Sequence, residues 1–93
     1  MQTAQLIEKE LIPSLHFPSY IIEKTAEQYR ELKRKLRSAE ILGNIHHNKI
    51  RILFEDEFGL KEVRTTIWAV GETHIVLKQG IIIPIRRLVD IRL

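Results

Sequence analysis

The last residues of the chain, 80–93, read GIIIPIRRLVDIRL and carry its clearest fold signal. A proline has no amide hydrogen to donate to a sheet, so a strand that contains Pro84 ends there or lies at a sheet edge. Arg86 and Arg87 then leave room for one tight turn, after which residues 88–93 resume an alternation of apolar and charged side chains. The segment therefore predicts two strands that meet at a sharp turn containing two arginines.

Upstream of this segment the apolar pattern has a period of two, interrupted by turn signals. KIRILFE (49–55) alternates apolar and charged residues, EVRTTIWAV (62–70) is rich in β-branched residues, and HIVLK (74–78) is a third short run. Together with 81–85 and 88–93, these runs predict a five-stranded antiparallel β-barrel over about residues 49–93. A strand, one tight helical turn and a second strand is how small barrels of the SH3 type close.

The spacing of apolar residues changes near Gly43: before it the period is that of a helix, and after it the period is two. Residues 3–12 predict a short helix that Pro13 ends. A long helix is expected over about 19–42, with Ser19 as its N-cap and the glycine as its stop. The apolar stripe of this helix comprises Ile22, Thr25, Tyr29, Leu32, Leu36 and Ala39.

Length and composition define the broad class of the protein. The 93 residues suit a single α+β domain, 1–93, in which a helical part (1–43) packs on a barrel part (44–93). The chain has no cysteine, which excludes disulfides, thiolate nucleophiles and cysteine-based zinc sites. No apolar run approaches the roughly 18 residues of a membrane span, and the N-terminus lacks a signal-peptide pattern. We therefore expect a cytoplasmic protein with no membrane partner.

The residue groupings that indicate catalysis are missing from the sequence. Asp56 and Asp90 do not lie in a nucleophile–histidine pattern, and no phosphate-binding glycine loop is present. His46 and His47 are adjacent, and on a strand they would point to opposite sides, so we interpret them as part of a polar linker. We expect no enzyme activity, no cofactor, no metal site and no small-molecule substrate.

A basic segment is the first candidate for a binding surface. The net charge is only +3, but RELKRKLR (30–37) concentrates cations. On a helix, Arg30, Lys33, Arg34 and Arg37 share one broad face, which could follow a nucleic-acid backbone through counterion release. The alternative, a solvated face of an amphipathic helix, is the commoner outcome and is the one we favour.

The paired arginines of the C-terminal turn are the second candidate. In a tight turn, both Arg86 and Arg87 can reach solvent and present their guanidinium groups to phosphate. The alternative is a solvated turn whose arginines pair with Asp90 or with the acidic stretch 55–57. We favour the second interpretation.

Three apolar residues are candidates for an interface. Trp68 lies in a segment whose two faces are both apolar, so we expect it in the core. An exposed Trp68 would instead be a stacking platform for a base or an anchor for a partner. Tyr29 and Leu36 of the helix stripe have the same ambiguity, and packing on the barrel is the favoured interpretation.

The strings KIRILFED, TTIWAVGETHIVLK and IIIPIRRLVDI resemble the strands of the Sm/Lsm-like group, which includes the bacterial Sm-like RNA chaperone. The resemblance covers about residues 49–93, and the preceding helix is similar to the N-terminal helix of that group. The chain also resembles a set of small bacterial proteins with no assigned activity. The resemblance implies an SH3-type barrel that forms rings and binds RNA.

In Sm proteins, RNA is bound by an Asn in the loop after the second strand and by an Arg-Gly in the last motif. The resemblance places His74 or Thr73 at the Asn position and Arg86 at the Arg position. The Gly has no counterpart, because Arg87 follows. The family's RNA pocket is thus matched only in part.

The sequence favours a non-catalytic binding or scaffold module that associates with itself or with a protein partner, because the apolar residues are numerous for so small a domain. The alternative is a protein that binds single-stranded RNA or other nucleic acid. That function would use Arg86, Arg87, His74 and the basic face of the long helix.

Overall fold

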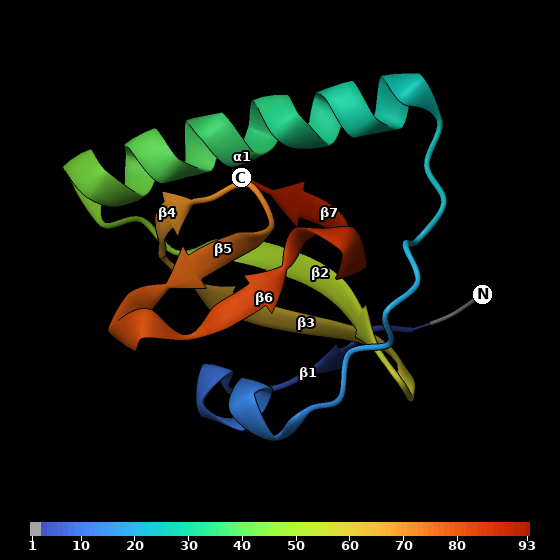
Figure 1. Ribbon diagram of the computed structural model, residues 1–93. Helices are drawn as coiled ribbons and strands as arrows, with labels where there is room; N and C mark the ends of the chain where they lie inside the picture. Colours follow the sequence, from blue (N-terminus) through green and yellow to red (C-terminus); the bar gives the residue numbers. More distant parts are fainter. Residues whose placement is uncertain (1–2) are drawn as a thin grey trace.

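The computed structural model describes residues 3–93 as one long α-helix lying across two β-sheets (Figure 1). The mixed α+β class predicted from the sequence is confirmed. In chain order the elements are β1 (Gln5–Leu6), η1 (Lys9–Ser14), α1 (Ala26–His46), β2 (Ile50–Asp56), β3 (Gly59–Thr65), β4 (Ile67–Val70), β5 (His74–Leu77), η2 (Lys78–Gly80), β6 (Ile82–Pro84), η3 (Ile85–Arg87) and β7 (Leu88–Arg92), where η denotes a 3-10 turn.

The start of α1 is set by a capping box. The Thr25 hydroxyl accepts a hydrogen bond from the amide of Gln28 at 3.0 Å, and the Gln28 side chain accepts one from the amide of Thr25 at 2.9 Å. The predicted N-cap, Ser19, is therefore wrong, and residues 19–25 form an extended connector that we call the strap. Ser19 lacks the Gln or Glu three positions later that would complete such a box.

The end of α1 also differs from the prediction. Gly43 is a buried residue inside the helix. Only glycine fits there, because a Cβ at this position would lie 2.2 Å from the carbonyl oxygen of Ile67. The helix continues to His46 and stops at His47, whose backbone is left-handed at φ 54°. The glycine allows the helix to approach β4 closely. The two histidines form the end of the helix and not the linker that we expected.

The predicted helix over 3–12 is wrong. The segment forms the two-residue strand β1, which runs parallel to β3, and then the 3-10 turn η1, which contains Pro13. An isolated helix of this length is marginal in water, and pairing with a sheet edge satisfies the same backbone groups. Ile12 is buried, so the segment covers part of the core.

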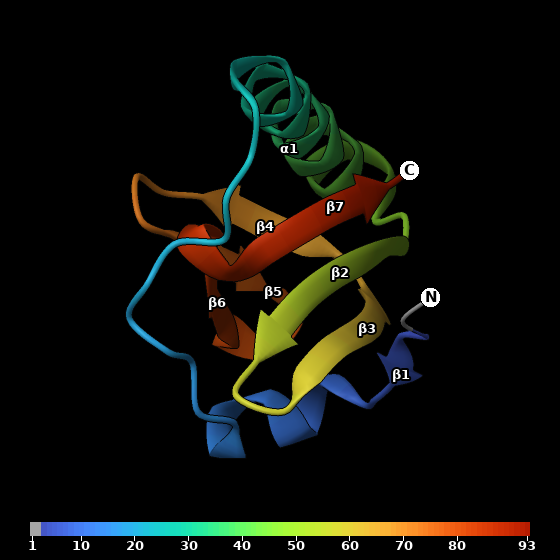
Figure 2. The same cartoon turned by 90° about the vertical axis from the view of Figure 1, so that its right-hand side faces the viewer.

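The strands form two sheets, with the orders β1-β3-β2-β7 and β4-β5-β6. The predicted strand 62–70 is interrupted at Thr66, where the chain passes from the first sheet to the second (Figure 2). The hydroxyl of Thr66 donates a hydrogen bond to the carbonyl of His47. The backbone carbonyl of Thr66 accepts one from the amide of Lys78. Among residues 3–93, backbone pairing does not join the two sheets into one closed barrel, so the expected five-stranded closed barrel is not seen.

The C-terminal segment follows the prediction. β6 is an edge strand of its sheet and ends at Pro84, η3 supplies the tight turn, and β7 resumes antiparallel to β2. The core lies between the sheets and under α1, whose Leu32, Leu36 and Ala39 are buried as the stripe predicted.

Candidate functional site

Two adjoining hollows lie between the first turns of α1, the loop 71–73 and the turn η3. Their volumes are about 1070 and 500 Å³, and Tyr29, Glu72 and Ile85 line both. Arg86 lines the larger hollow, while the smaller one is lined by two helix cations, Lys33 and Arg37. We call the two hollows together the helix–turn groove.

Backbone and side-chain hydrogen bonds hold the walls of the groove together. The amide of Ile85 in η3 donates to the carbonyl of Thr73 at 2.9 Å. The amide of Val70, just before the loop, donates to the carboxylate of Glu40 on α1 at 2.7 Å. The loop is thereby tied to both the turn and the helix.

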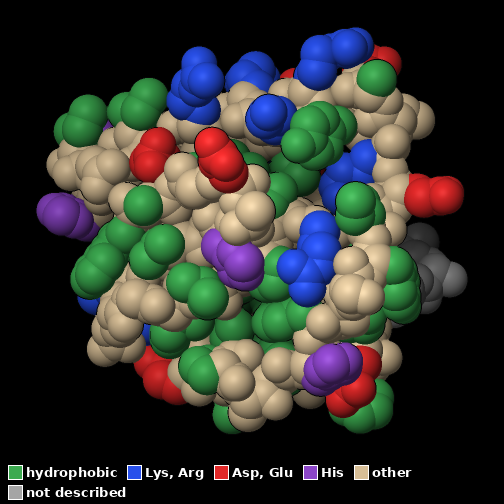
Figure 3. All heavy atoms as spheres, viewed as in Figure 1, with side chains coloured by type: hydrophobic (Ala, Val, Ile, Leu, Met, Phe, Trp, Pro, Cys, Tyr) green, Lys and Arg blue, Asp and Glu red, His purple; other side chains and the backbone are tan. Residues whose placement is uncertain are grey.

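The helical wall places an aromatic ring and two cations in one line. Tyr29, Lys33 and Arg37 follow at intervals of four residues, so they lie on one side of the helix. Tyr29 is 47% exposed, and the Lys33 ammonium lies 5.3 Å from the centre of its ring. In Figure 3, cationic side chains follow the helix along the edge of the molecule, and further cations lie lower on the same face.

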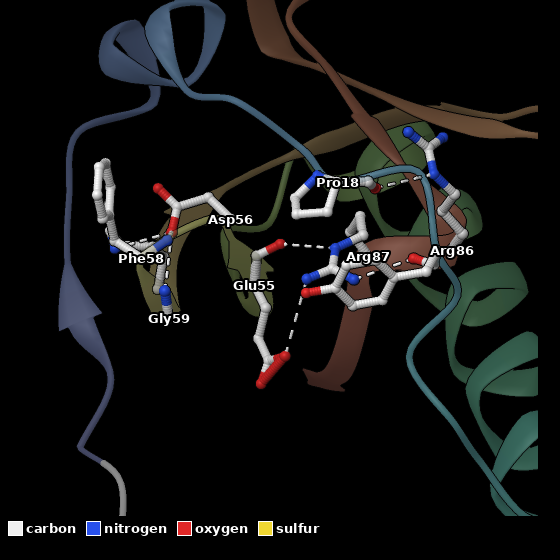
Figure 4. A network of polar contacts seen from close by, with 9 residues as sticks. Pro18, Glu55, Asp56, Phe58, Gly59, Arg86 and Arg87 are labelled. Atoms are coloured by element: carbon white, nitrogen blue, oxygen red, sulfur yellow. Dashed lines mark hydrogen bonds and ion pairs between the residues drawn. The ribbon is translucent and has the colours of Figure 1, made fainter.

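Arg86 supplies a cation from the opposite wall. Its Nε donates to the carbonyl of Pro18 at 3.4 Å, and its own carbonyl accepts the amide of Ile22 at 3.2 Å (Figure 4). The side chain is half-buried and borders the larger hollow. The structure thus brings Arg86 beside the helix residues that the sequence analysis singled out separately.

Arg87 does not reach solvent, so the expectation of exposure is wrong, but its Nη2 lies 3.9 Å from the Glu55 carboxylate, as the favoured pairing with the acidic stretch 55–57 predicted. The residue is 2% exposed; its Nε donates to the carbonyl of Glu55 at 3.1 Å, and its Nη1 donates to the carbonyl of Tyr20 at 3.0 Å. Its guanidinium also lies 4.8 Å from the centre of the Tyr20 ring. Adjacent residues of a tight turn point in different directions, so one arginine faces the groove and the other holds the strap.

Arg30 and Arg34, the other two residues of the predicted basic face, are exposed and lie outside the groove. Arg34 pairs with Glu31 through two hydrogen bonds, which lower the pKa of the Glu31 carboxyl and raise that of the guanidinium. Arg30 is exposed on the same helix. The predicted broad basic face exists as a solvated surface, and only Lys33 and Arg37 of its four residues line the groove.

His74 lies beside the groove without lining it. The ring is half-buried on β5, and its Nδ1 shares a 2.8 Å hydrogen bond with the hydroxyl of Thr73. Thr73, the other candidate for the Asn position of the Sm-like motif, lines the larger hollow. The hydrogen bond therefore connects His74 to the groove through Thr73.

The three interface candidates have different outcomes: Tyr29 and Trp68, which we expected to be packed inside, are about half exposed, whereas Leu36 lies in the core as expected. Trp68 is 45% exposed, so the expectation of a core tryptophan is wrong. A register shift in the pairing of β4 with β5 lies between Ile67 and Ala69, and Ile67 is the residue that fills the core. Leu36 is 2% exposed inside the chain, which leaves it no surface for a partner.

Sequence reasoning missed the acidic and strap residues of the site. Glu72 lines both hollows, and Lys24 of the strap lines the larger one. Burial lowers the pKa of Lys24, although the nearby Glu55 carboxylate opposes that shift. The strap was assigned to a helix, so nothing in the pattern placed its side chains opposite the loop.

Among residues 3–93, no three potential metal-binding side chains come together, and no helix of that range is both long and apolar enough to cross a membrane. No protein-family model, curated protein or solved structure matches the chain.

Proposed function

We propose that this chain is a non-catalytic module that binds single-stranded RNA in the helix–turn groove. One observation carries the proposal: the groove places an exposed aromatic ring, Tyr29, between helix cations and a cation from a turn far along the sequence. Lys33 and Arg37 come from one wall, and Arg86 comes from the other.

The chemistry of the groove suits an unpaired strand. A base can stack on the Tyr29 ring, a contact worth about 1–3 kcal/mol and tolerant of sequence. Phosphates on either side of that base would meet Lys33 and Arg86, and guanidinium groups bind phosphate through paired hydrogen bonds. Glu72 and Glu40 also line the groove, so we expect moderate affinity that depends strongly on salt.

The resemblance to the Sm-like group supports the same assignment. We infer an SH3-type, Sm-like arrangement in which β3 continues into β4 and the turn η3 precedes the last strand. The two loops that bind RNA in that group correspond here to 71–74 and 84–87. A 2.9 Å hydrogen bond joins these two loops and makes them one side of the groove.

Titration of a labelled single-stranded RNA, followed by fluorescence anisotropy at several salt concentrations, tests the proposal. Three phosphate contacts give a slope of log affinity against log salt of about −2 for a single strand. The variant Lys33→Gln/Arg86→Gln removes two of them, so we expect a slope of about −0.7 and binding weakened by at least tenfold. Tyr29→Ala should weaken binding at every salt concentration while leaving the slope unchanged.

The matched control is Lys9→Gln/Lys78→Gln, which removes the same charge from η1 and η2. It should keep the wild-type slope. Equal weakening by both double variants would reduce the effect to net charge and overturn the groove as the site. Absence of saturable binding at tens of micromolar protein in low salt would overturn the RNA assignment itself.

A second candidate function is self-association, and the exposure of Trp68 favours it. Tryptophan is enriched among the residues that dominate the binding energy of protein interfaces. Ile41 and Ile45 on α1 are also more than half exposed. We expect light scattering to report a dimer or larger assembly for the wild type and a monomer for Trp68→Glu, with Phe58→Glu as a control at another exposed aromatic residue. A wild-type monomer at high concentration would refute this function.

A further inference from the structure

Three arginines form a row across the first sheet, on a face separate from the helix–turn groove. Arg51 of β2 is directly opposite Arg64 of β3 on one side and Arg92 of β7 on the other. Directly opposed residues of neighbouring strands point to the same face, and Figure 2 shows these three strands side by side. We call this set the arginine row.

Such a row is unfavourable unless other charges compensate it, because like charges directly opposite each other destabilise a sheet. Glu62 accepts hydrogen bonds from Arg51 at 2.9 and 3.2 Å and from Arg64 at 3.1 Å, and these contacts lower the pKa of its carboxyl. Asp90 lies 3.9 Å from Arg92 and 3.0 Å from Lys35 of α1. Four cations therefore share two carboxylates, which leaves two positive charges uncompensated.

The guanidinium groups remain available to a ligand. The side chains of Arg51, Arg64 and Arg92 are 45%, 57% and 54% exposed. Arg64 uses only its Nε toward Glu62, and the contact of Arg92 with Asp90 is a long ion pair. Within residues 3–93, the terminal amino groups of these two arginines make no hydrogen bond, so each can offer a complete edge to an anion.

We propose that the arginine row binds the phosphate backbone of a nucleic-acid duplex. Neighbouring strands lie about 4.8 Å apart, so three of them spread the guanidinium groups over roughly 10 Å, a span suited to several phosphates and not to a single small anion. Guanidinium groups match phosphate oxygens in paired geometry. None of the three arginines lines the helix–turn groove, so the row is distinct from the proposed RNA site. Contacts limited to phosphates position a duplex without reading its sequence.

The test is a titration of a labelled 20-base-pair DNA duplex by fluorescence anisotropy between 50 and 200 mM salt. Three phosphate contacts predict a slope of about −2.7 in log affinity against log salt. The variant Arg64→Gln/Arg92→Gln should bring the slope to about −0.9 and weaken binding at 50 mM salt by at least tenfold. It leaves the paired hydrogen bonds between Arg51 and Glu62 in place, and circular dichroism checks that the variant is folded.

The charge-matched control, Lys9→Gln/Lys78→Gln, and the groove variant, Lys33→Gln/Arg86→Gln, should both keep the wild-type slope. Equal loss in the control would overturn the row as a site, since net charge alone would then explain the binding. Absence of saturable duplex binding at 50 mM salt would overturn the proposal. Displacement of the duplex by polyglutamate at equal total charge would also overturn it, and would assign the row to an acidic protein. RNA binding in the groove does not depend on any of these results.

Discussion

Replacement of Asp56 by alanine is expected to lower the free energy of unfolding by about 3–5 kcal/mol, the usual cost of removing one member of a buried ion pair. The Asp56 side chain is 1% exposed, and its Oδ1 accepts a hydrogen bond from the Lys61 ammonium at 3.1 Å. The same oxygen accepts the amides of Phe58 and Gly59 at 3.0 and 3.1 Å (Figure 4). The substitution therefore leaves a buried cation and two turn amides without partners. Urea denaturation measures the effect.

Two further variants separate the charge from the turn. Asp56→Asn keeps an oxygen for the two amides and removes the negative charge, so its loss should be smaller than that of Asp56→Ala. Glu57→Ala changes the next residue, which is exposed, and should stay within about 0.5 kcal/mol of the wild type. A loss below 1 kcal/mol for Asp56→Ala would contradict the buried pair that the structure shows.

Strand periodicity was predictable because each signal is local. The alternation in β2 and the proline at the end of β6 each depend on only a few neighbouring residues. The strand, turn and strand of the C-terminal segment follow from such signals. The buried stripe of α1 was predictable for the same reason, since a helix repeats every 3.6 residues. The break at Thr66 was not, because both neighbouring segments have high strand propensity and only the packing of two sheets requires it.

The N-terminal part was not predictable from local pattern. Residues 5–6 become a strand because the edge of β3 is available to them, and residues 19–25 stay extended because they cross η3 to reach the start of α1. Both are consequences of contacts with residues more than fifty positions away. The pattern of the strap, with apolar residues near its start, is equally compatible with a helix.

The candidate site was predictable as separate pieces and not as a groove. Basic residues on the helix and in the C-terminal turn were visible in the sequence, but their distance from each other was not. Nor could the sequence distinguish Arg86 from Arg87, because two adjacent arginines in a turn have the same local pattern. Their different roles arise from the strap, whose Tyr20 carbonyl accepts a hydrogen bond from Arg87.

Replacement of Arg87 by alanine should therefore have the second large effect, a loss of about 3 kcal/mol in the free energy of unfolding. Each hydrogen bond of a charged donor contributes roughly 1.5–3 kcal/mol. The substitution removes such bonds to the carbonyls of Glu55 and Tyr20, together with the contact to the Tyr20 ring, from a fully buried position. The strap should then open more readily than the rest of the chain, and hydrogen exchange at the Ile22 amide reports that opening.

The neighbouring arginine provides the control. Arg86→Ala removes one hydrogen bond of 3.4 Å and leaves the backbone carbonyl that accepts the Ile22 amide, so its loss should stay below about 1 kcal/mol. Arg87→Lys keeps the charge but has all its donors on one nitrogen, whereas the guanidinium reaches the two carbonyls with two separate nitrogens, so it should recover only part of the loss. If Arg86→Ala and Arg87→Ala were equally destabilising, or if exchange at Ile22 were unchanged in Arg87→Ala, the strap would not be held by the buried guanidinium. A strap held in this way fixes one wall of the helix–turn groove, so Arg87→Ala should also weaken RNA binding although the residue never touches the ligand.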